Sequence, residues 1–188
     1  MPITIFRAVK RNLLTQGFNS NPNMVEFYKK YGMSNHGGYD WLTKDGDPVY
    51  FDCSCKGFVL NTEIDNAGGL GVNVITENDG VILKHRYWHF KGFAVEAGQE
   101  VDTGCLLGYA DNTGASTGSH LHRDCKEMFR DNNGNLKVKY PNNGTFGTVD
   151  ISDRFENWFV LDVMDNLNAQ VSILKKVVGL IKQLIGLK

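Results

Sequence analysis

The feature that most constrains the fold is a series of short β-prone runs between residues 48 and 110. Clusters of Gly, Asn and Asp separate these runs, and Asn78-Asp79-Gly80 between two apolar segments is typical of a hairpin turn. Closely spaced short strands favour a compact antiparallel sheet or sandwich. The sequence therefore predicts a mainly β domain, with runs at residues 49–51, 57–60, 71–75 and 81–84.

Composition limits the classes of partner. The chain has 188 residues, a formal net charge of -1 and 41% hydrophobic residues, enough for one domain with an appendage. A nucleic-acid binder normally carries a basic face or a high pI, so we expect no nucleic acid. No apolar stretch reaches the ~20 residues of a membrane span. The opening MPITIFR lacks the apolar run and cleavage site of a signal peptide.

The four cysteines do not form a zinc-finger pattern. Cys53 and Cys55 are too close together for the usual pairs, and Cys105 and Cys125 stand apart. We favour free thiols, and hence synthesis in a reducing compartment. Cys53 and Cys55 are expected to act as buried small apolar groups.

Two histidines follow a loop of small residues at 113–119. In a strand, alternate side chains share a face, so His120 and His122 point the same way and Leu121 points the other way. Two imidazoles side by side suit a metal, or a metal ligand with a catalytic neighbour. Strand polarity alone is the simpler alternative.

Further candidate ligands lie upstream. The loop NHGGYDW brings His36 and Asp40 within reach of a common point, and His89 lies in the aromatic run YWHF. Histidine and carboxylate ligands without a thiolate suit catalytic zinc, which uses three protein ligands and one open position. A hydrogen-bonded loop pair and a half-buried strand histidine are the alternatives. His85 could face the same cleft by strand alternation, but we expect it to have an accessory or surface role.

Taken in order, these segments resemble the lysostaphin/LytM-type zinc endopeptidases, which cut peptide bonds in bacterial peptidoglycan. The resemblance covers roughly residues 12–160, and its segments are LTQGF, NHGGYDW, VNVITENDGVILKHRYWHF and VEAGQEVDTGCLLGYADNTGASTGSHLH. It implies a two-sheet antiparallel β domain of the duplicated hybrid motif type. It also implies that His36, Asp40 and His122 are zinc ligands and that His89 and His120 are the catalytic pair.

The implied chemistry is hydrolysis by a zinc-activated water, because zinc lowers the pKa of bound water from about 15.7 to about 7. His120 would take the proton from that water, and His89 would stabilise charge on the carbonyl oxygen, although the resemblance does not firmly separate these two roles. Ser119 replaces a proline of the family, and Arg123-Asp124 replaces an apolar-acidic pair. Neither change removes a ligand, so we expect an active enzyme.

The C-terminal segment differs from the rest. Residues 1–165 are expected to form the peptidase domain and residues 166–188 a cationic amphipathic helix with no acid after Asp165. A heptad seam and the lysines define this tail: Leu167, Val171, Leu174, Val178, Ile181 and Ile185, with Lys175, Lys176, Lys182 and Lys188. Self-packing, oligomerisation and contact with an anionic membrane are all open.

The sequence thus predicts a zinc-dependent endopeptidase acting on stem or bridge peptides of peptidoglycan. Without a visible signal peptide, we expect synthesis in the cytoplasm and a phage-type lysin, a virion-associated wall hydrolase or a non-standard export route. The alternatives are a non-catalytic wall-binding module and a structural virion protein. Cleft loops set the choice of bond, which the sequence leaves open.

Overall fold

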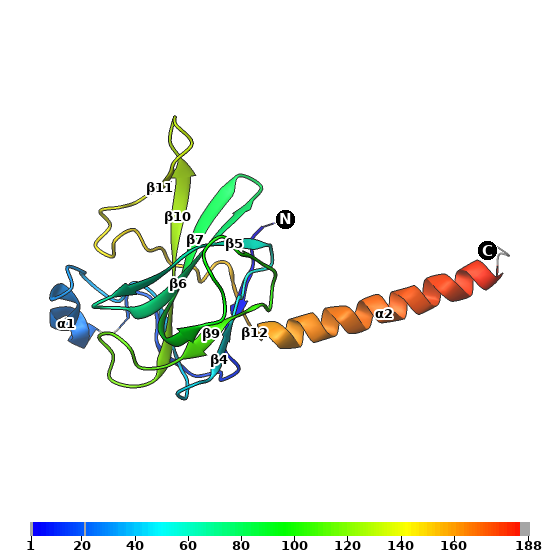
Figure 1. Cartoon of the computed structure of the whole chain (residues 1–188), viewed down its shortest axis with the longest axis horizontal. Helices are drawn as coiled ribbons and strands as arrows, with labels where there is room; N and C mark the ends of the chain where they lie inside the picture. The colour runs from blue at the N-terminus through cyan, green and yellow to red at the C-terminus, as the bar shows by residue number, and fades with distance from the viewer. Residues whose placement is uncertain (1, 21, 185–188) are drawn as a thin grey trace.

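The computed structural model describes residues 2–20 and 22–184 of the chain. It contains a β body from which one long helix projects (Figure 1). The mainly β prediction with a C-terminal helix is confirmed. The body also carries a short helical segment near the N-terminus, formed by η1 (Pro22–Met24) and α1 (Val25–Lys29).

The main sheet has the strand order β2-β3-β10-β7-β6-β5-β8, and all its pairs are antiparallel. Strand β11 pairs with β10, and β9 joins β7 to β4. The bounds are β2 Leu14–Gln16, β3 Tyr39–Leu42, β4 Pro48–Tyr50, β5 Gly57–Asp65, β6 Gly69–Asn78, β7 Val81–Phe93, β8 Glu100–Val101, β9 Leu106–Ala110, β10 His120–Arg130 and β11 Leu136–Val138.

The predicted hairpin turn joins β6 to β7. Asp79 and Gly80 have φ values of 49° and 77°, and both belong to the left-handed region. Two consecutive residues with positive φ match the right-handed twist of the flanking strands, which is why Asp-Gly suits this position.

A second, two-stranded sheet pairs β1 (Ile5–Arg7) with β12 (Phe155–Phe159) in parallel. The expectation of two antiparallel sheets therefore holds for the main sheet only. A parallel pair needs a long connection, and here nearly the whole domain lies between the two strands. No local turn signal could have revealed this pairing.

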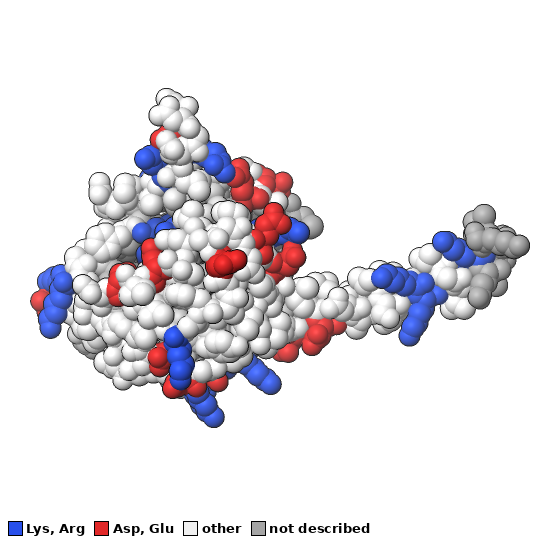
Figure 2. Space-filling view, in the orientation of Figure 1, with Lys and Arg blue, Asp and Glu red and all other residues white. Residues whose placement is uncertain are grey.

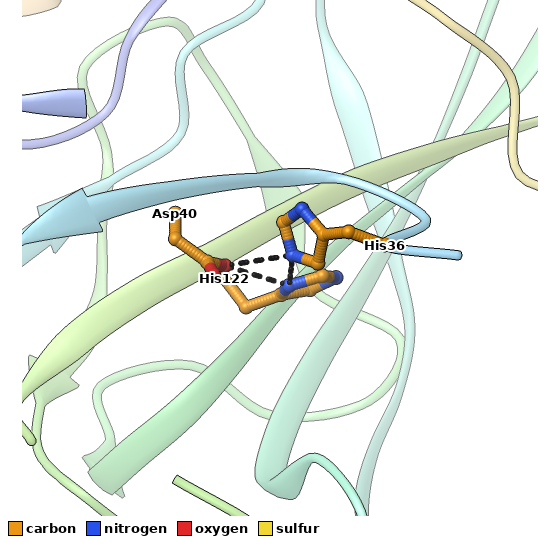
Figure 3. Close-up of side chains that lie close together, drawn as sticks. All are labelled: His36, Asp40 and His122. Carbon is orange, nitrogen blue, oxygen red and sulfur yellow. Dashed lines mark hydrogen bonds and ion pairs between the residues drawn. The ribbon is translucent and has the colours of Figure 1, made fainter. Parts of the chain in front are cut away.

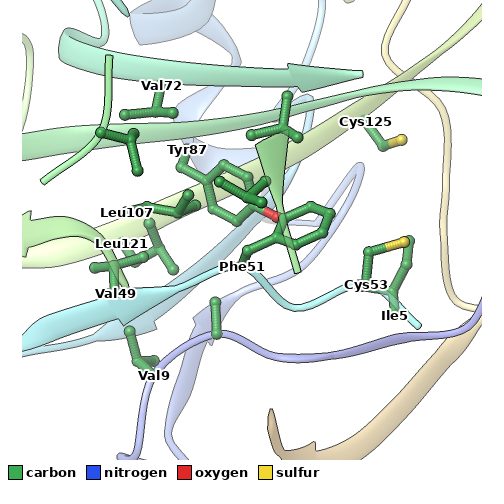
Figure 4. Packing of buried hydrophobic residues seen from close by; sticks show 14 of the residues in the cluster. Ile5, Val9, Val49, Phe51, Cys53, Val72, Tyr87, Leu107, Leu121 and Cys125 are labelled. Atoms are coloured by element: carbon green, nitrogen blue, oxygen red, sulfur yellow. The ribbon is translucent and has the colours of Figure 1, made fainter. Parts of the chain in front are cut away.

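The core lies on one face of the central strands (Figure 4). On β10 the alternation is strict: Leu121 and Cys125 are fully buried in the core, whereas His120 and His122 face the other way. Arg123 also points into the core, where its guanidinium makes bonds of 3.1 and 3.0 Å with the Asp52 carboxylate. The unusual arginine of the sequence is thus a buried ion-pair partner.

His85 is a core residue. Its exposure is 0%, its Nε2 lies 2.8 Å from Thr76 Oγ1, and Arg123 Nη2 donates to its Nδ1 at 2.7 Å. The expectation of an accessory or surface role was wrong about the surface, because His85 shares the core face of β7 with Tyr87. All four cysteines are thiols, with Cys53 buried as expected and Cys55 half-buried.

Helix α2 (Val160–Leu184) begins earlier than predicted. The heptad pattern indicated a start at Leu167, but the helix follows β12 directly, and its first turn packs Leu161 and Met164 beside Gly104. Ile185, Leu187 and Lys188, which the sequence assigned to the tail helix, lie outside the described residues. The domain boundary at residue 165 stays a prediction.

Candidate metal centre

Three side chains that are distant in the sequence converge on one point (Figure 3). Nε2 of His36 lies 3.1 Å from Oδ1 of Asp40 and 3.0 Å from Nδ1 of His122. The third side of this triangle, from His122 Nδ1 to Asp40 Oδ1, is 2.9 Å. These three residues are the ones that the resemblance implies as ligands.

Strand pairing and a close backbone approach bring the triangle together. Asp40 on β3 stands directly opposite His122 on β10, and His36 lies in the loop that leads into β3. The loop passes against β10 at Gly38, where an added Cβ would lie 2.8 Å from His122 Nε2 and 2.8 Å from the Arg123 carbonyl oxygen. Only glycine allows so close an approach, which explains one glycine of the NHGGYDW motif.

The outer nitrogen of His36 is fixed by the backbone. Its Nδ1 lies 2.9 Å from the Gly17 carbonyl oxygen and donates its hydrogen there. This bond selects the tautomer in which Nε2 carries a lone pair toward the triangle. Gly17 belongs to the LTQGF segment, so that segment supplies a backbone acceptor behind the first ligand.

A buried carboxylate lies behind His122. Oδ2 of Asp124 is 3.3 Å from Nε2 of His122 and has no other partner among the described residues. Its second oxygen accepts from Nε of Arg86 at 2.7 Å. Arg86 in turn lies over the Trp88 ring at 5.4 Å. Asp124 is therefore placed to take the Nε2 hydrogen of His122, which leaves Nδ1 free for a metal.

The donor set fits zinc. Ligand atoms at about 2.0–2.1 Å from one tetrahedral ion stand about 3.3 Å apart, close to the separations seen here. Burial alone would raise the pKa of Asp40, but hydrogen bonds and charge from His122 and His36 hold it well below its usual range. Burial would likewise lower the pKa of His122, yet Asp124 and Asp40 raise it to about 9. The same negative charge that favours a proton here favours a divalent cation.

His89 and His120 stand beside the triangle. Their ring centroids are 4.4 Å apart, and Nε2 of His120 lies 3.6 Å from Asp40 Oδ1. Each Nδ1 is bound to a backbone carbonyl oxygen: that of Thr113 for His89, at 2.6 Å, and that of Gly118 for His120, at 2.8 Å. Both imidazoles therefore present Nε2 to the site.

His89 reaches the site through a strained backbone. Strict alternation would place it on the face opposite to Trp88, but its φ of 64° turns it so that both residues line the same cleft. Its amide donates to Gly68 at 3.0 Å and its carbonyl oxygen accepts from Asp111 at 2.7 Å. Burial, followed by the neighbouring His120 and His122, lowers the pKa of His89 to about 4.

The cleft over these residues has a volume of about 230 Å³. Side chains from the N-terminal helical segment form one wall, and Phe146 from the loop after β11 lies on the rim. Apolar groups line much of it, notably Met24, Phe27, Tyr28, Tyr31, Trp88 and Phe146. Among the strand aromatics, Trp88 lies in the cleft, whereas Trp41 and Tyr87 belong to the core.

Sequence reasoning placed the triangle and the histidine pair but missed their supports. Asp124 lies two residues after His122 on the same strand, so alternation could have identified it as a neighbour on the same face. Arg86 stands opposite Asp124 across β7 and β10, a pairing that only the register reveals. The role of Gly17 could not be predicted from its residue type, because it acts through its backbone carbonyl oxygen.

A family model described as peptidase family M23 matches residues 34–137. The glycyl-glycine endopeptidase ALE-1 of Staphylococcus capitis is 33% identical over 127 residues, which are 60% of this chain and 34% of that protein. The peptidoglycan DD-endopeptidase ShyA of Vibrio cholerae is 36% identical over 87 residues, 46% of this chain and 19% of that protein. The chain thus spans about a third or less of the length of these relatives.

Solved structures agree on the fold. The catalytic domain of the antimicrobial peptidase lysostaphin from Staphylococcus simulans has a TM-score of 0.53 at 26% identity, covering 69% of this chain and 90% of that one. A zinc-containing peptidase from Vibrio cholerae has a TM-score of 0.51 at 28% identity, covering 65% of this chain and 37% of that one. The cleft-facing histidines therefore lie on a lysostaphin-like fold.

Proposed function

Because the chain belongs to peptidase family M23, a family of zinc-dependent metallopeptidases, we propose that it hydrolyses peptide bonds in bacterial peptidoglycan. The observation that carries the proposal is the convergence of His36, Asp40 and His122, with two further histidines at the same place. Both matched relatives named above are endopeptidases, one of glycyl-glycine bonds and one of peptidoglycan.

We propose that zinc is held by Nε2 of His36, Oδ1 of Asp40 and Nδ1 of His122, the atoms that form the triangle. When bound, zinc supplies a Lewis acid that polarises a carbonyl and lowers the pKa of a water molecule. Asp124 and the Gly17 carbonyl hold the two imidazoles in the required tautomers. Two supports of this kind favour a metal site over a chance cluster.

The proposed proton acceptor is Nε2 of His120. It lies nearest to the triangle, and its Nδ1 is already committed to the Gly118 carbonyl. A proton taken from the attacking water would charge the ring, and the neighbouring Asp40 carboxylate would stabilise that charge. The imidazolium can then return the proton to the leaving amine.

His89 is proposed to act on the substrate carbonyl side of the cleft. Its lowered pKa keeps it neutral near pH 7, with the Nδ1 hydrogen donated to Thr113. Nε2 is then an acceptor, and it becomes a donor to a developing oxyanion only when a proton reaches it. The two ring centroids are 4.4 Å apart, so both imidazoles face the same reaction space, and the single proton from the water can serve only one of them at a time.

The test is the clearing of purified bacterial walls. We expect turbidity to fall, a chelator to stop the loss, and added zinc to restore it. His122→Ala should abolish both activity and stoichiometric zinc, while Lys126→Ala on the same strand should retain both. Activity that survives chelation and His122→Ala would refute the zinc mechanism. A folded protein that binds walls but never releases peptides would favour the non-catalytic module.

We also propose a phage-type lysin or virion-associated setting, for which the cationic tail is the supporting feature. Peptides of this chain in purified phage particles or lysates would support that setting. The bond stays open, since the relatives named here act on different ones. Mass spectrometry of products from walls with different cross-bridges would identify it.

A further inference from the structure

Helix α2 leaves the body after its first turn, and no other described part of the chain covers it beyond that point. Every residue from 165 to 182 is exposed. The apolar ones are bare despite their size: Ile173 is 60% exposed, Leu174 62% and Leu180 60%. Figure 1 shows the helix extending away from the sheet. An apolar surface of this extent on one element requires a partner.

The apolar surface is a broad arc. At 100° per residue, the outer half of the helix places six apolar side chains over about 160° of its circumference. They are Ile173, Leu174, Val177, Val178, Leu180 and Ile181. A narrow two-stranded seam would cover Leu174, Val178 and Ile181 but would leave Ile173 and Leu180 in water.

The charges on this half all have one sign. Lys175, Lys176 and Lys182 are exposed, and the chain has no Asp or Glu after Asp165. Figure 2 shows basic side chains on the outer part of the helix and acidic ones only near its base. In projection, Lys176 borders one edge of the apolar arc and Lys182 the other, each about 40° from the nearest apolar residue.

These charges argue against a coiled coil. In a heptad built on Val171 and Leu174, Lys175 and Lys182 occupy the flanking e positions, where an oppositely charged side chain would normally face them. No acid is present on the facing stretch to pair with them. A second copy of this helix would therefore leave these lysines without counter-charges.

We propose that α2 lies flat on an anionic lipid membrane surface. The wide arc would enter the boundary between headgroups and acyl chains, and the lysines at its two edges would reach anionic headgroups. No described helix is long and apolar enough to cross a membrane. This inference goes beyond the proposed peptidase function and does not depend on it.

The experiment uses the full chain with vesicles of phosphatidylglycerol and phosphatidylcholine, and with vesicles of phosphatidylcholine alone. We expect sedimentation with the anionic vesicles and not with the neutral ones. Each lysine near an anionic surface contributes roughly five-fold in partitioning, and Lys176 and Lys182 lie at the edges of the arc, so K175Q/K176Q/K182Q should weaken binding by at least about 25-fold. The matched control, K56Q/K91Q/K139Q, removes the same charge from exposed lysines of the body and should bind normally.

A second variant separates a membrane from self-association. I173Q/L180Q changes the part of the arc that a two-stranded seam would not use, so it should reduce vesicle binding. Molar mass in solution should be that of a monomer, and circular dichroism should verify folding of each variant. Equal binding to both vesicles, no binding, or a stable oligomer that I173Q/L180Q leaves intact would each overturn the proposal.

Discussion

The carboxylate behind His122 provides a sharp test of how the metal centre is held. Replacing Asp124 by Asn keeps the shape of the side chain but removes the charge that faces His122 Nε2 at 3.3 Å. Loss of such a support typically weakens metal affinity 10- to 100-fold, which corresponds to about 1.4–2.7 kcal/mol. We therefore expect zinc to dissociate from Asp124→Asn at a correspondingly lower chelator concentration.

Asp52→Asn is the matched control for this prediction. Asp52 is equally buried and also pairs with an arginine, but its partner Arg123 is on the core face of β10. Breaking a buried pair costs about 3–5 kcal/mol of stability. Arg86 is partly exposed, so the loss in Asp124→Asn should be smaller. Asp52→Asn should thus lose more stability and keep its zinc affinity.

Competition with a fluorescent zinc chelator gives the affinity, and thermal unfolding of the metal-free proteins gives the stability. The reasoning fails if Asp124→Asn binds zinc like the parent protein. It fails equally if Asp52→Asn weakens zinc as much as Asp124→Asn does, because the effect would then come from general loosening of β10.

Gly38→Ala should displace the His122 ring and lower zinc affinity. Gly92→Ala is the control, because a Cβ there meets nothing within 4 Å, and it should keep the parent affinity. Equal zinc affinities of the two variants in a chelator titration would contradict the argument that only glycine fits at residue 38. Zinc at 100 times its dissociation constant should raise the melting temperature by about 5–11 °C, and an unchanged melting curve would argue against binding. Burial and Arg123 lower the pKa of His85, so the unfolded chain binds a proton on this residue that the native core excludes, and the contribution of His85 to stability should be constant above pH 6.5 and decline below it by up to about 1.4 kcal/mol per pH unit. His85→Gln should show a shallower decline in urea unfolding, and an identical slope would place the acid sensitivity elsewhere.

Local patterns predicted the strands and the face that carries the histidines. Alternation on β10 needs only the sequence, and Asp79-Gly80 identifies its own turn. The position of His89 depends on a positive φ that interrupts alternation, and the same break explains why His85 does not share the cleft face with His89. The parallel pairing of β1 with β12 joins residues some 150 positions apart, and no short-range signal reports such a pairing.

The tail illustrates a different limit. Periodicity predicted a helix and its apolar residues, but the start at Val160 follows from continuity with β12 rather than from the heptad. The partner that covers the apolar arc lies outside the chain, so periodicity cannot predict it. Only the positions of Lys176 and Lys182 beside the arc indicate the chemistry of that partner.

Strand β10 carries the cleft histidines on one face and core side chains on the other. This difference fixes the register in which β10 pairs with the neighbouring strands. A shift of this register by one residue would place the His122 imidazole in the core and the Arg123 guanidinium in the cleft. Asp52 would then lie buried without a counter-ion. Variants designed to change the proposed peptide specificity should therefore leave this strand untouched. Substitutions are better made at Phe27, Tyr31 and Phe146, which border the cleft from loops and a short helix.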